Sequence, residues 1–325
     1  MKTRDKILKI IRQNSQMSVN EITLALDISR QYVHRVLLDL EEENLIVKVG
    51  IAPKVYYSAL EAPKSSLNEI ITYENEMYLN KHFITIDPLG NKLEGLSAMV
   101  YWCERQNLPL IKTVDEFIQT KEKYNSFFNE AGLINGTEKL RTSKGIGNIC
   151  VDELYYLDFY AIERFGKTRL GTLMHYAKQG QNKDLIKIIV KEVKQRILSL
   201  TQTLEIDAVL FVPPTISRKI QIMNFLEKYL ALNIPSVKID KIKTPIIVPQ
   251  KALSKIFERV SNAKNTFFVP HQKKCNHVLI IDDAVGSGAT INEIACKIKE
   301  KEIAIKVTGL AITGSYKGFE VISEL

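Results

Sequence analysis

The segment from His277 to Ile298 constrains the fold of this chain more than any other stretch. It reads HVLIIDDAVGSGATINEIACKI. Val278 to Ile281 form an apolar run of the kind that is buried in a parallel sheet. After an acid pair and a glycine-bearing loop, apolar residues recur at helical spacing, at Ile291, Ile294, Ala295 and Ile298. A strand that runs into a loop and a helix predicts an α/β fold whose ligand site lies at the carboxyl edge of the sheet.

The loop after the predicted strand has the composition of a phosphate site. Its glycines let the backbone approach an anion, the amides at the helix start point toward it, and the Ser287 and Thr290 hydroxyls add donors. We therefore expect a sugar 5-phosphate to bind at Val285, Gly286, Ser287, Gly288, Ala289 and Thr290. Asp282 and Asp283 cannot hold phosphate, but they can accept hydrogen bonds from vicinal ribose hydroxyls or help to seat Mg²⁺. They are the predicted ribose-binding and catalytic residues, with any metal contact indirect.

The run IIDDAVGSGAT resembles the phosphoribosyl-pyrophosphate (PRPP) signature of type I phosphoribosyltransferases. In that signature two hydrophobic residues precede two acids, two variable residues and a Ser/Thr-Ser/Thr-Gly-x-Thr loop. One departure is Gly286, where the family usually has Thr, and it removes a hydroxyl. The resemblance implies a type I phosphoribosyltransferase-like fold, PRPP or a phosphoribosyl nucleotide as ligand, and Mg²⁺ as cofactor.

A second predicted strand, Asp207 to Val212, is followed by a helix from about Ile220 to Ala231. The resemblance implies that the loop between them binds pyrophosphate, through Thr215, Arg218 and Lys219. The stretch FGKTRLGTLMHYAKQ at 165–179 is similar to the opening helix of the ComF-like branch of this family, which is associated with DNA uptake. Further similarity to that branch lies at Gln250, Leu253, Arg259 and Asn262. The base-contacting stretch usual after the second strand is missing, so the acceptor base and catalytic competence stay open.

The first 60 residues predict three helices and a hairpin. Apolar residues share one face between Thr3 and Asn14, and Ser18 with Glu21 forms a capping box that opens a second helix to Leu26. Ser29 can cap a third helix, and two strands flank the turn at 50–53. This order resembles the winged helix-turn-helix family of bacterial regulators.

The outward face of the third predicted helix is basic in its N-terminal half, the half that enters a major groove. With two lysines near the tip of the hairpin, the predicted contacts to double-stranded DNA are Arg30, Gln31, His34, Arg35, Lys48 and Lys54. Winged helices also serve as protein-protein or dimerisation modules, and that alternative stays open. The net charge of +8 is compatible with a polyanionic partner and does not decide between the two.

The expected organisation is a winged-helix domain at 1–60, a linker at 61–84, a helical connecting segment at 85–164 and the phosphoribosyltransferase-like domain at 165–325. In the connecting segment we predict a helix from Leu93 to Gln106 and a second one opened by a capping box at Thr113. Its aromatic residues are interpreted as packing and not as a base-stacking platform. They are Tyr155, Tyr156, Phe159, Tyr160 and, just beyond the segment, Phe165.

The remaining composition excludes several classes. No apolar run approaches the ~20 residues that cross a bilayer, which predicts a cytoplasmic protein without membrane contact. The four cysteines lie far apart without a CxxC pair, so we expect four reduced thiols and no zinc cluster.

A winged helix joined to a PRPP-type site resembles purine-regulator repressors of Gram-positive bacteria, and this favours a ligand-responsive transcriptional regulator that dimerises to match two half-sites. The alternative is an active phosphoribosyltransferase or a nucleotide-modifying effector. That pairing of domains also resembles effectors encoded beside reverse transcriptases in anti-phage defence, which implies a reverse transcriptase or non-coding RNA as partner. A third reading is a scaffold in which both modules have lost their ligands.

Overall fold

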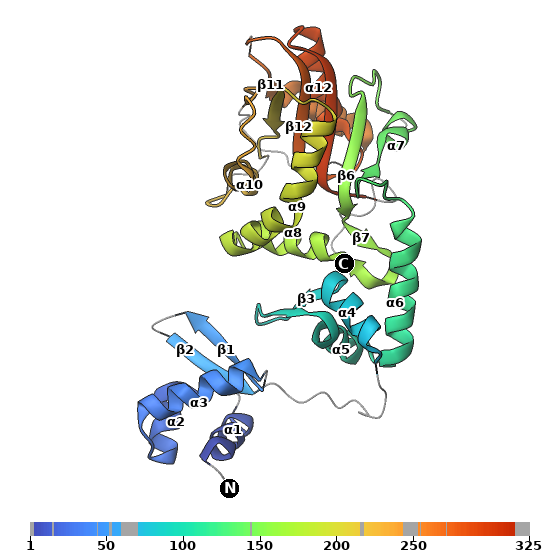
Figure 1. Cartoon of the computed structure of the whole chain (residues 1–325). Helices are drawn as coiled ribbons and strands as arrows, with labels where there is room; N and C mark the ends of the chain where they lie inside the picture. Colours follow the sequence, from blue (N-terminus) through green and yellow to red (C-terminus); the bar gives the residue numbers. More distant parts are fainter. Residues whose placement is uncertain are drawn as a thin grey trace. The chain divides into compact units, whose positions relative to one another are not determined.

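The computed structural model describes residues 3–14, 16–43, 45–51, 54–59, 71–143, 145–214, 218–242, 253, 255–270 and 272–315. The chain divides into two compact units, Met1–Val114 and Asp115–Leu325, and each is taken by itself (Figure 1). Within the described ranges, none of the helices combines the length and the apolar character that crossing a membrane requires.

The N-terminal head has the expected three helices and hairpin. Its elements are α1 (Thr3–Gln13), α2 (Val19–Leu26), α3 (Arg30–Glu42), β1 (Ile46–Ile51) and β2 (Lys54–Ala59). Ser18 and Glu21 form the predicted capping box at the start of α2, and the Ser29 hydroxyl accepts from the Tyr32 amide at the start of α3. The antiparallel hairpin pairs Ile46 with Ala59. One apolar core joins helices and hairpin, and it includes Ile7, Ile11, Ile22, Val33, Leu37, Leu40 and Tyr57.

The segment after the head departs from the sequence prediction at two places. Its elements are α4 (Tyr73–His82), β3 (Ile84–Ile86), β4 (Lys92–Glu94), α5 (Gly95–Gln106) and α6 (Leu110–Asn125). Residues 73–82, expected in the linker, are helical because the Thr72 hydroxyl accepts from the Asn75 amide and caps α4. Thr113 does not cap α6: it lies within the helix, and its hydroxyl donates to the carbonyl of Pro109 at 2.6 Å. The helix to Gln106 is confirmed.

The second unit is built on a five-stranded sheet in the order β5-β6-β13-β12-β9. The strands are β5 (Ile134–Asn135), β6 (Glu153–Phe159), β9 (Ala208–Phe211), β12 (Cys275–Val285) and β13 (Ala304–Gly314). All neighbours in the sheet are parallel except β5 and β6, and this confirms an α/β fold with a mainly parallel sheet. The expectation that 85–164 is a helical segment is wrong for β5 and β6, because β6 supplies the neighbour of β13 in the sheet.

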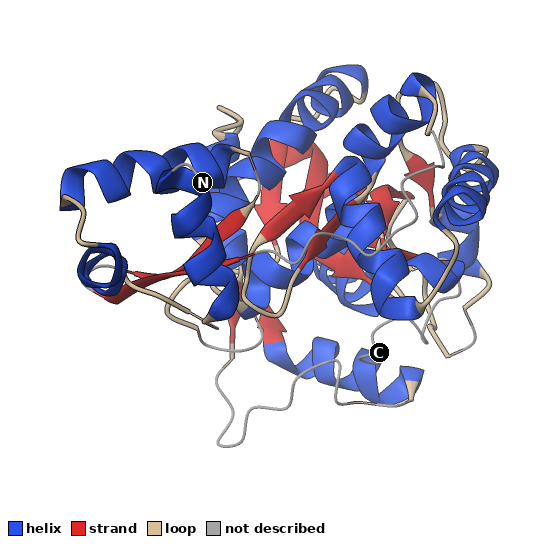
Figure 2. Cartoon of the chain, turned by 90° about the horizontal axis from the view of Figure 1, so that it is seen from below, coloured by secondary structure: helices blue, strands red, loops and turns tan. Residues whose placement is uncertain are grey.

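Helices lie on both sides of this sheet (Figure 2). The helices of this unit after α6 are α7 (Thr137–Arg141), α8 (Arg169–Gln179), α9 (Lys183–Thr203), α10 (Ile222–Leu230), α11 (Ile256–Thr266) and α12 (Ala289–Glu300). The shorter elements are β7 (Ala161–Ile162), the 3-10 turn Glu163–Phe165, β8 (Gly166–Lys167), β10 (Asp240–Lys241) and β11 (Phe267–Phe268). The aromatic residues read as packing do pack: Tyr156, Phe159 and Phe165 are buried, and Phe159 meets Tyr124 edge-on at 5.3 Å between ring centres.

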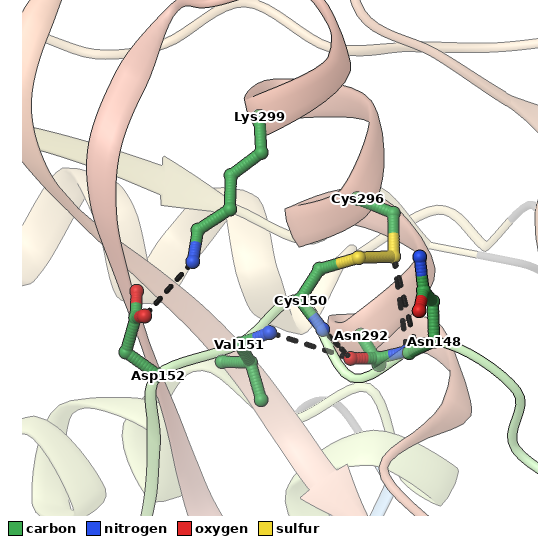
Figure 3. The surroundings of a disulfide bond; sticks show 7 residues. All are labelled: Asn148, Cys150, Val151, Asp152, Asn292, Cys296 and Lys299. Atoms are coloured by element: carbon green, nitrogen blue, oxygen red, sulfur yellow. Dashed lines mark hydrogen bonds and ion pairs between the residues drawn. A yellow bond between two sulfur atoms is a disulfide. The ribbon is translucent and has the colours of Figure 1, made fainter.

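The expectation of four reduced thiols is wrong, because Cys150 and Cys296 form a disulfide (Figure 3). Asn292 of α12 brings the two cysteines together. Its side-chain oxygen accepts from the Cys150 amide at 2.8 Å and the Val151 amide at 3.3 Å, and its nitrogen donates to the Asn148 carbonyl at 2.7 Å. The loop before β6 is thereby fixed to α12, and the cysteine Cα atoms lie 4.9 Å apart. Cys103 and Cys275 form no disulfide.

The disulfide predicts a thiol count and a loss of stability on reduction. Protein denatured without reductant should show two titratable thiols, and reduced protein four. Because the bridge closes a loop across 146 residues, Cys150→Ser should lower the free energy of unfolding by about 2–4 kcal/mol. Cys275→Ser is the matched control, and under oxidising conditions it should leave the loop closed. Four thiols without reductant would contradict the assignment.

Candidate functional site

The acid pair lies inside the carboxyl end of β12 and not in a loop after it. Asp282 pairs with Ala311 of β13 in the parallel ladder, and the strand continues to Val285. The Asp282 carboxylate accepts from the Asp283 amide at 2.7 Å, and the Asp283 carbonyl accepts from the Thr313 hydroxyl at 3.4 Å. Both acids therefore stand at the edge of the sheet at which ligands bind in open α/β folds.

Two cations that come from other elements gather at the acid pair. Lys178, in the last turn of α8, forms an ion pair with Asp283. Arg218 donates to the Lys178 carbonyl and, at 3.3 Å, to the side-chain oxygen of Gln179. The sequence predicts Arg218 as a pyrophosphate ligand. In the structure it contacts the end of α8, and Lys178 lies between it and Asp283. Lys178 was missed, although it lies in the 165–179 stretch that resembles the ComF-like branch.

Burial and charge perturb this cluster. Burial, and then the neighbouring Asp283 carboxylate, raise the pKa of Asp282 to about 7, while Lys178 opposes that rise. Burial disfavours the charged form of Lys178, but its carboxylate partner Asp283 outweighs burial and raises the lysine pKa. A carboxyl that titrates near neutrality at the edge of a parallel sheet is the kind of group found at functional sites.

The predicted phosphate loop is a tight connection between β12 and α12. Residues 286–288 bend, and Gly288 stands at the N-cap of α12 with φ +81° and no side-chain cap. The Ser287 hydroxyl accepts from the Ala289 amide at 3.4 Å. A Cβ on Gly288 would lie 2.7 Å from the Leu140 side chain, so only glycine fits this left-handed position. A 12-residue helix thus presents its start beside the acid pair, with Thr290 in its first turn and Val285 buried below it.

The other two predicted ligands of pyrophosphate are Thr215 and Lys219. Thr215 lies outside the described residues. Lys219 is exposed and lines a surface hollow of about 530 Å³ with the α8–α9 turn and Phe225. Of the ComF-like positions, Gln250 is also outside the described residues, and the Arg259 guanidinium donates to the Leu253 carbonyl at 2.9 Å.

A magnesium ion would have few protein ligands here. In the ranges that the structure describes, no group of three or more His, Cys, Asp or Glu side chains could hold a metal. Asp282 and Asp283 supply two carboxylates, and one of them pairs with Lys178. Such a donor set fits Mg²⁺ only if phosphate oxygens of a ligand supply most of its coordination.

The basic surface of the head is exposed as predicted. Arg30, Gln31, His34 and Arg35 are exposed on α3, and the Arg35 guanidinium lies 5.0 Å from the centre of the Tyr32 ring. Lys48 is exposed on β1, and the side chain of Lys54 lies outside the described residues. The face therefore offers bidentate donors at the N-terminal half of α3.

Comparisons with known proteins separate the two units. Residues 2–47 match the family of winged helix-turn-helix DNA-binding domains, and this identifies the head. None of the curated proteins matches the chain. Similar solved structures include two of Trypanosoma cruzi hypoxanthine phosphoribosyltransferase, one in complex with its product IMP. Both are 15% identical over 44% of this chain and 71% or 72% of theirs, with TM-scores of 0.29 and 0.28, which are too low to define a fold or an activity.

The raised pKa of Asp282 predicts that this carboxyl destabilises the fold above neutral pH. Its folded pKa of about 7 exceeds the ordinary aspartate value of 3.8, so the folded state binds the proton more tightly and stability falls as pH rises between these values. At pH 8, Asp282→Asn should raise the free energy of unfolding by about 1–3 kcal/mol, and the gain should shrink at pH 4.5.

Asp207 offers the contrasting variant in the same denaturation experiment. Burial acts to raise its pKa, but hydrogen bonds from the Asn276 and His277 amides outweigh this and lower it. Asp207→Asn should therefore destabilise at pH 8. Loss of stability at pH 8 in Asp282→Asn would show that the carboxylate is satisfied in the folded state.

Proposed function

We propose that this chain is a DNA-binding protein whose sheet unit binds PRPP or a related phosphoribosyl nucleotide, and that the ligand regulates transcription through the winged-helix head. One observation carries the ligand half of the proposal. Asp282 and Asp283, the start of α12 and the Lys178–Arg218 pair come from separate parts of the chain and meet at one sheet edge. A phosphoribosyl compound needs these groups: acids can accept hydrogen bonds from its ribose diol, amides can bind its 5-phosphate, and cations can bind further phosphates.

The charges support a polyphosphorylated ligand. Lys178 pairs with Asp283, so one positive charge is neutralised within the site, while Arg218 contacts only neutral oxygens among the hydrogen bonds described. A pyrophosphate group would give Arg218 an anionic partner, and charge-assisted hydrogen bonds are about twice as strong as neutral ones. Asp282 and Asp283 are the residues that would help to seat Mg²⁺, which would offset the negative charge of the pyrophosphate.

The regulator hypothesis is tested with duplexes from the DNA upstream of the coding sequence in a mobility-shift titration. The full chain should shift one such duplex, and PRPP with Mg²⁺ should change its affinity at least about fivefold, the low end of typical allosteric couplings. Ribose without phosphate is the control ligand and should change nothing. Binding without any response to PRPP would remove the regulatory half of the proposal.

The head predicts a further result in the same titration. Arg30→Ala with Arg35→Ala should weaken DNA binding at least about tenfold, because each arginine can contact a base edge or a phosphate. The slope of log affinity against log salt should fall by about 1–2 if these arginines neutralise phosphates. Lys6→Ala with Lys9→Ala removes the same charge from exposed positions of α1 and should act much less. Equal effects of the two pairs would contradict a specific α3 surface.

A second candidate function is transfer of the phosphoribosyl group, as an enzyme or a nucleotide-modifying effector. It is favoured by Lys178, which pairs with Asp283, and by Arg218 next to it, because their positive charges could stabilise departing pyrophosphate. Pyrophosphate release from PRPP on addition of a nucleobase, abolished by Asp282→Asn plus Asp283→Asn, would establish it. If calorimetry shows that PRPP binds but PRPP stays intact with every nucleobase, the transferase function is excluded and the regulator function remains.

The tight loop gives a prediction that both functions share. Gly288→Ala should reduce PRPP affinity at least about tenfold, because the new Cβ meets Leu140 and the left-handed φ is strained for alanine. Gly147→Ala is the matched control, since a Cβ there meets nothing within 4 Å. Calorimetry on the full chain measures both. Unchanged affinity in Gly288→Ala would place the phosphate elsewhere.

A further inference from the structure

The short helix α7 lies against the predicted phosphate loop. A Cβ placed on Gly288 would lie 2.7 Å from the Leu140 side chain of α7. The helix α7 therefore covers the start of α12. The helix is held on β6, because the Leu154 amide donates to the Thr137 hydroxyl at 2.9 Å and the Gly136 amide donates to the Leu154 carbonyl at 2.8 Å. Side chains of α7 therefore have a fixed place next to the loop.

One of those side chains reaches the carboxyl end of the neighbouring strand. The Lys139 ammonium donates to the carbonyl of Ser315, which directly follows β13. The Ser315 amide in turn donates to the carbonyl of Val285 at 3.0 Å, at the point where the loop begins. The lysine is thus brought to the loop from an element 176 residues away from Ser315 in the sequence.

The charge of Lys139 is not balanced inside the described part of the chain. No described carboxylate pairs with it, whereas its neighbours on α7, Glu138 and Arg141, pair with each other at 2.8 Å. Burial lowers the pKa of Lys139 to about 8, and no neighbouring charge offsets that effect. A partly buried ammonium that has only a neutral carbonyl as partner is costly unless an anion joins it.

A second polar group beside it also lacks a partner. Ser315 is 3% exposed, and its hydroxyl makes no hydrogen bond to any described residue. Buried hydroxyls are nearly always paired, so an unpaired one at a ligand edge points to a group that is supplied on binding. The Lys139 ammonium, the Ser315 hydroxyl and the amides at the start of α12 are all hydrogen-bond donors. A ligand that binds all of them must carry several acceptor oxygens.

We propose that Lys139 and the Ser315 hydroxyl bind the same phosphate monoester as the 286–290 loop, so that α7 and the end of β13 complete this phosphate subsite. The inference rests on the proposed phosphoribosyl site and adds two ligands that lie outside the strand-loop-helix segment. It also assigns a role to α7: the helix carries the counter-charge of the phosphate. The ligand class is a sugar phosphate monoester, with ribose 5-phosphate as its simplest member.

The test uses the full chain and calorimetric titration with ribose 5-phosphate at pH 7. Lys139→Met keeps the length of the side chain and removes its charge, and it should weaken binding at least about tenfold, as expected for a hydrogen bond between charged partners. Ser315→Ala should weaken binding by about two- to tenfold. Lys274→Met is the control: it removes one charge at the amino end of β12, where Lys274 pairs with Glu302, and should change affinity less than about twofold.

The outcomes separate the two proposals. Ribose 5-phosphate and PRPP that both fail to bind the unaltered chain would overturn the phosphoribosyl site and this inference with it. Ribose 5-phosphate that binds the unaltered chain and Lys139→Met equally would overturn the role of Lys139 and leave the loop as the phosphate site. Thermal unfolding of each variant checks the fold, and Lys139→Met should be at least as stable as the unaltered chain, because it removes an uncompensated charge.

Discussion

The parallel pairing of β12 with β13 across α12 is the constraint on which the sheet unit depends. Parallel neighbours need a crossover, and here the crossover is α12, which follows the end of β12 after the short bend at 286–288. The carboxyl ends of both strands and the start of α12 must therefore meet at one edge. Other segments contribute to this edge by packing against it: α8 brings a lysine, the chain after β9 brings an arginine, and α7 covers the loop.

The charged groups at this edge of the sheet lower the stability of the fold. A carboxyl in a desolvated position beside a second carboxylate, and an ammonium beside a carbonyl, are poor choices for a fold that serves only as a scaffold. The lysine of α8 offsets part of the first cost and nothing described offsets the second. A bound ligand that supplies partners for these groups would offset both costs, and this argues against a scaffold without ligands.

The sequence was sufficient where structure depends on neighbours along the chain. The Ser18 capping box, the Ser29 cap and the buried run 278–281 depend on local spacing, and all three are present. Thr113 shows the limit of such reasoning, since a cap-like pattern inside a helix hydrogen-bonds back to Pro109 instead. Contacts between distant residues had no sequence signal. Lys178 meets Asp283 across 105 residues and Cys150 meets Cys296 across 146, and local spacing does not encode which strand lies beside which.

The position of β6 between β5 and β13 bears on how this protein can be dissected. A truncation that begins at residue 165, the boundary expected from the family resemblance, would delete the parallel neighbour of β13 and leave that strand with unpaired amides and carbonyls along one side. It would also remove the loop that Asn292 holds. The smallest fragment with an intact sheet begins before Ile134, so ligand-binding measurements on shorter pieces would report aggregation-prone edges and not the site.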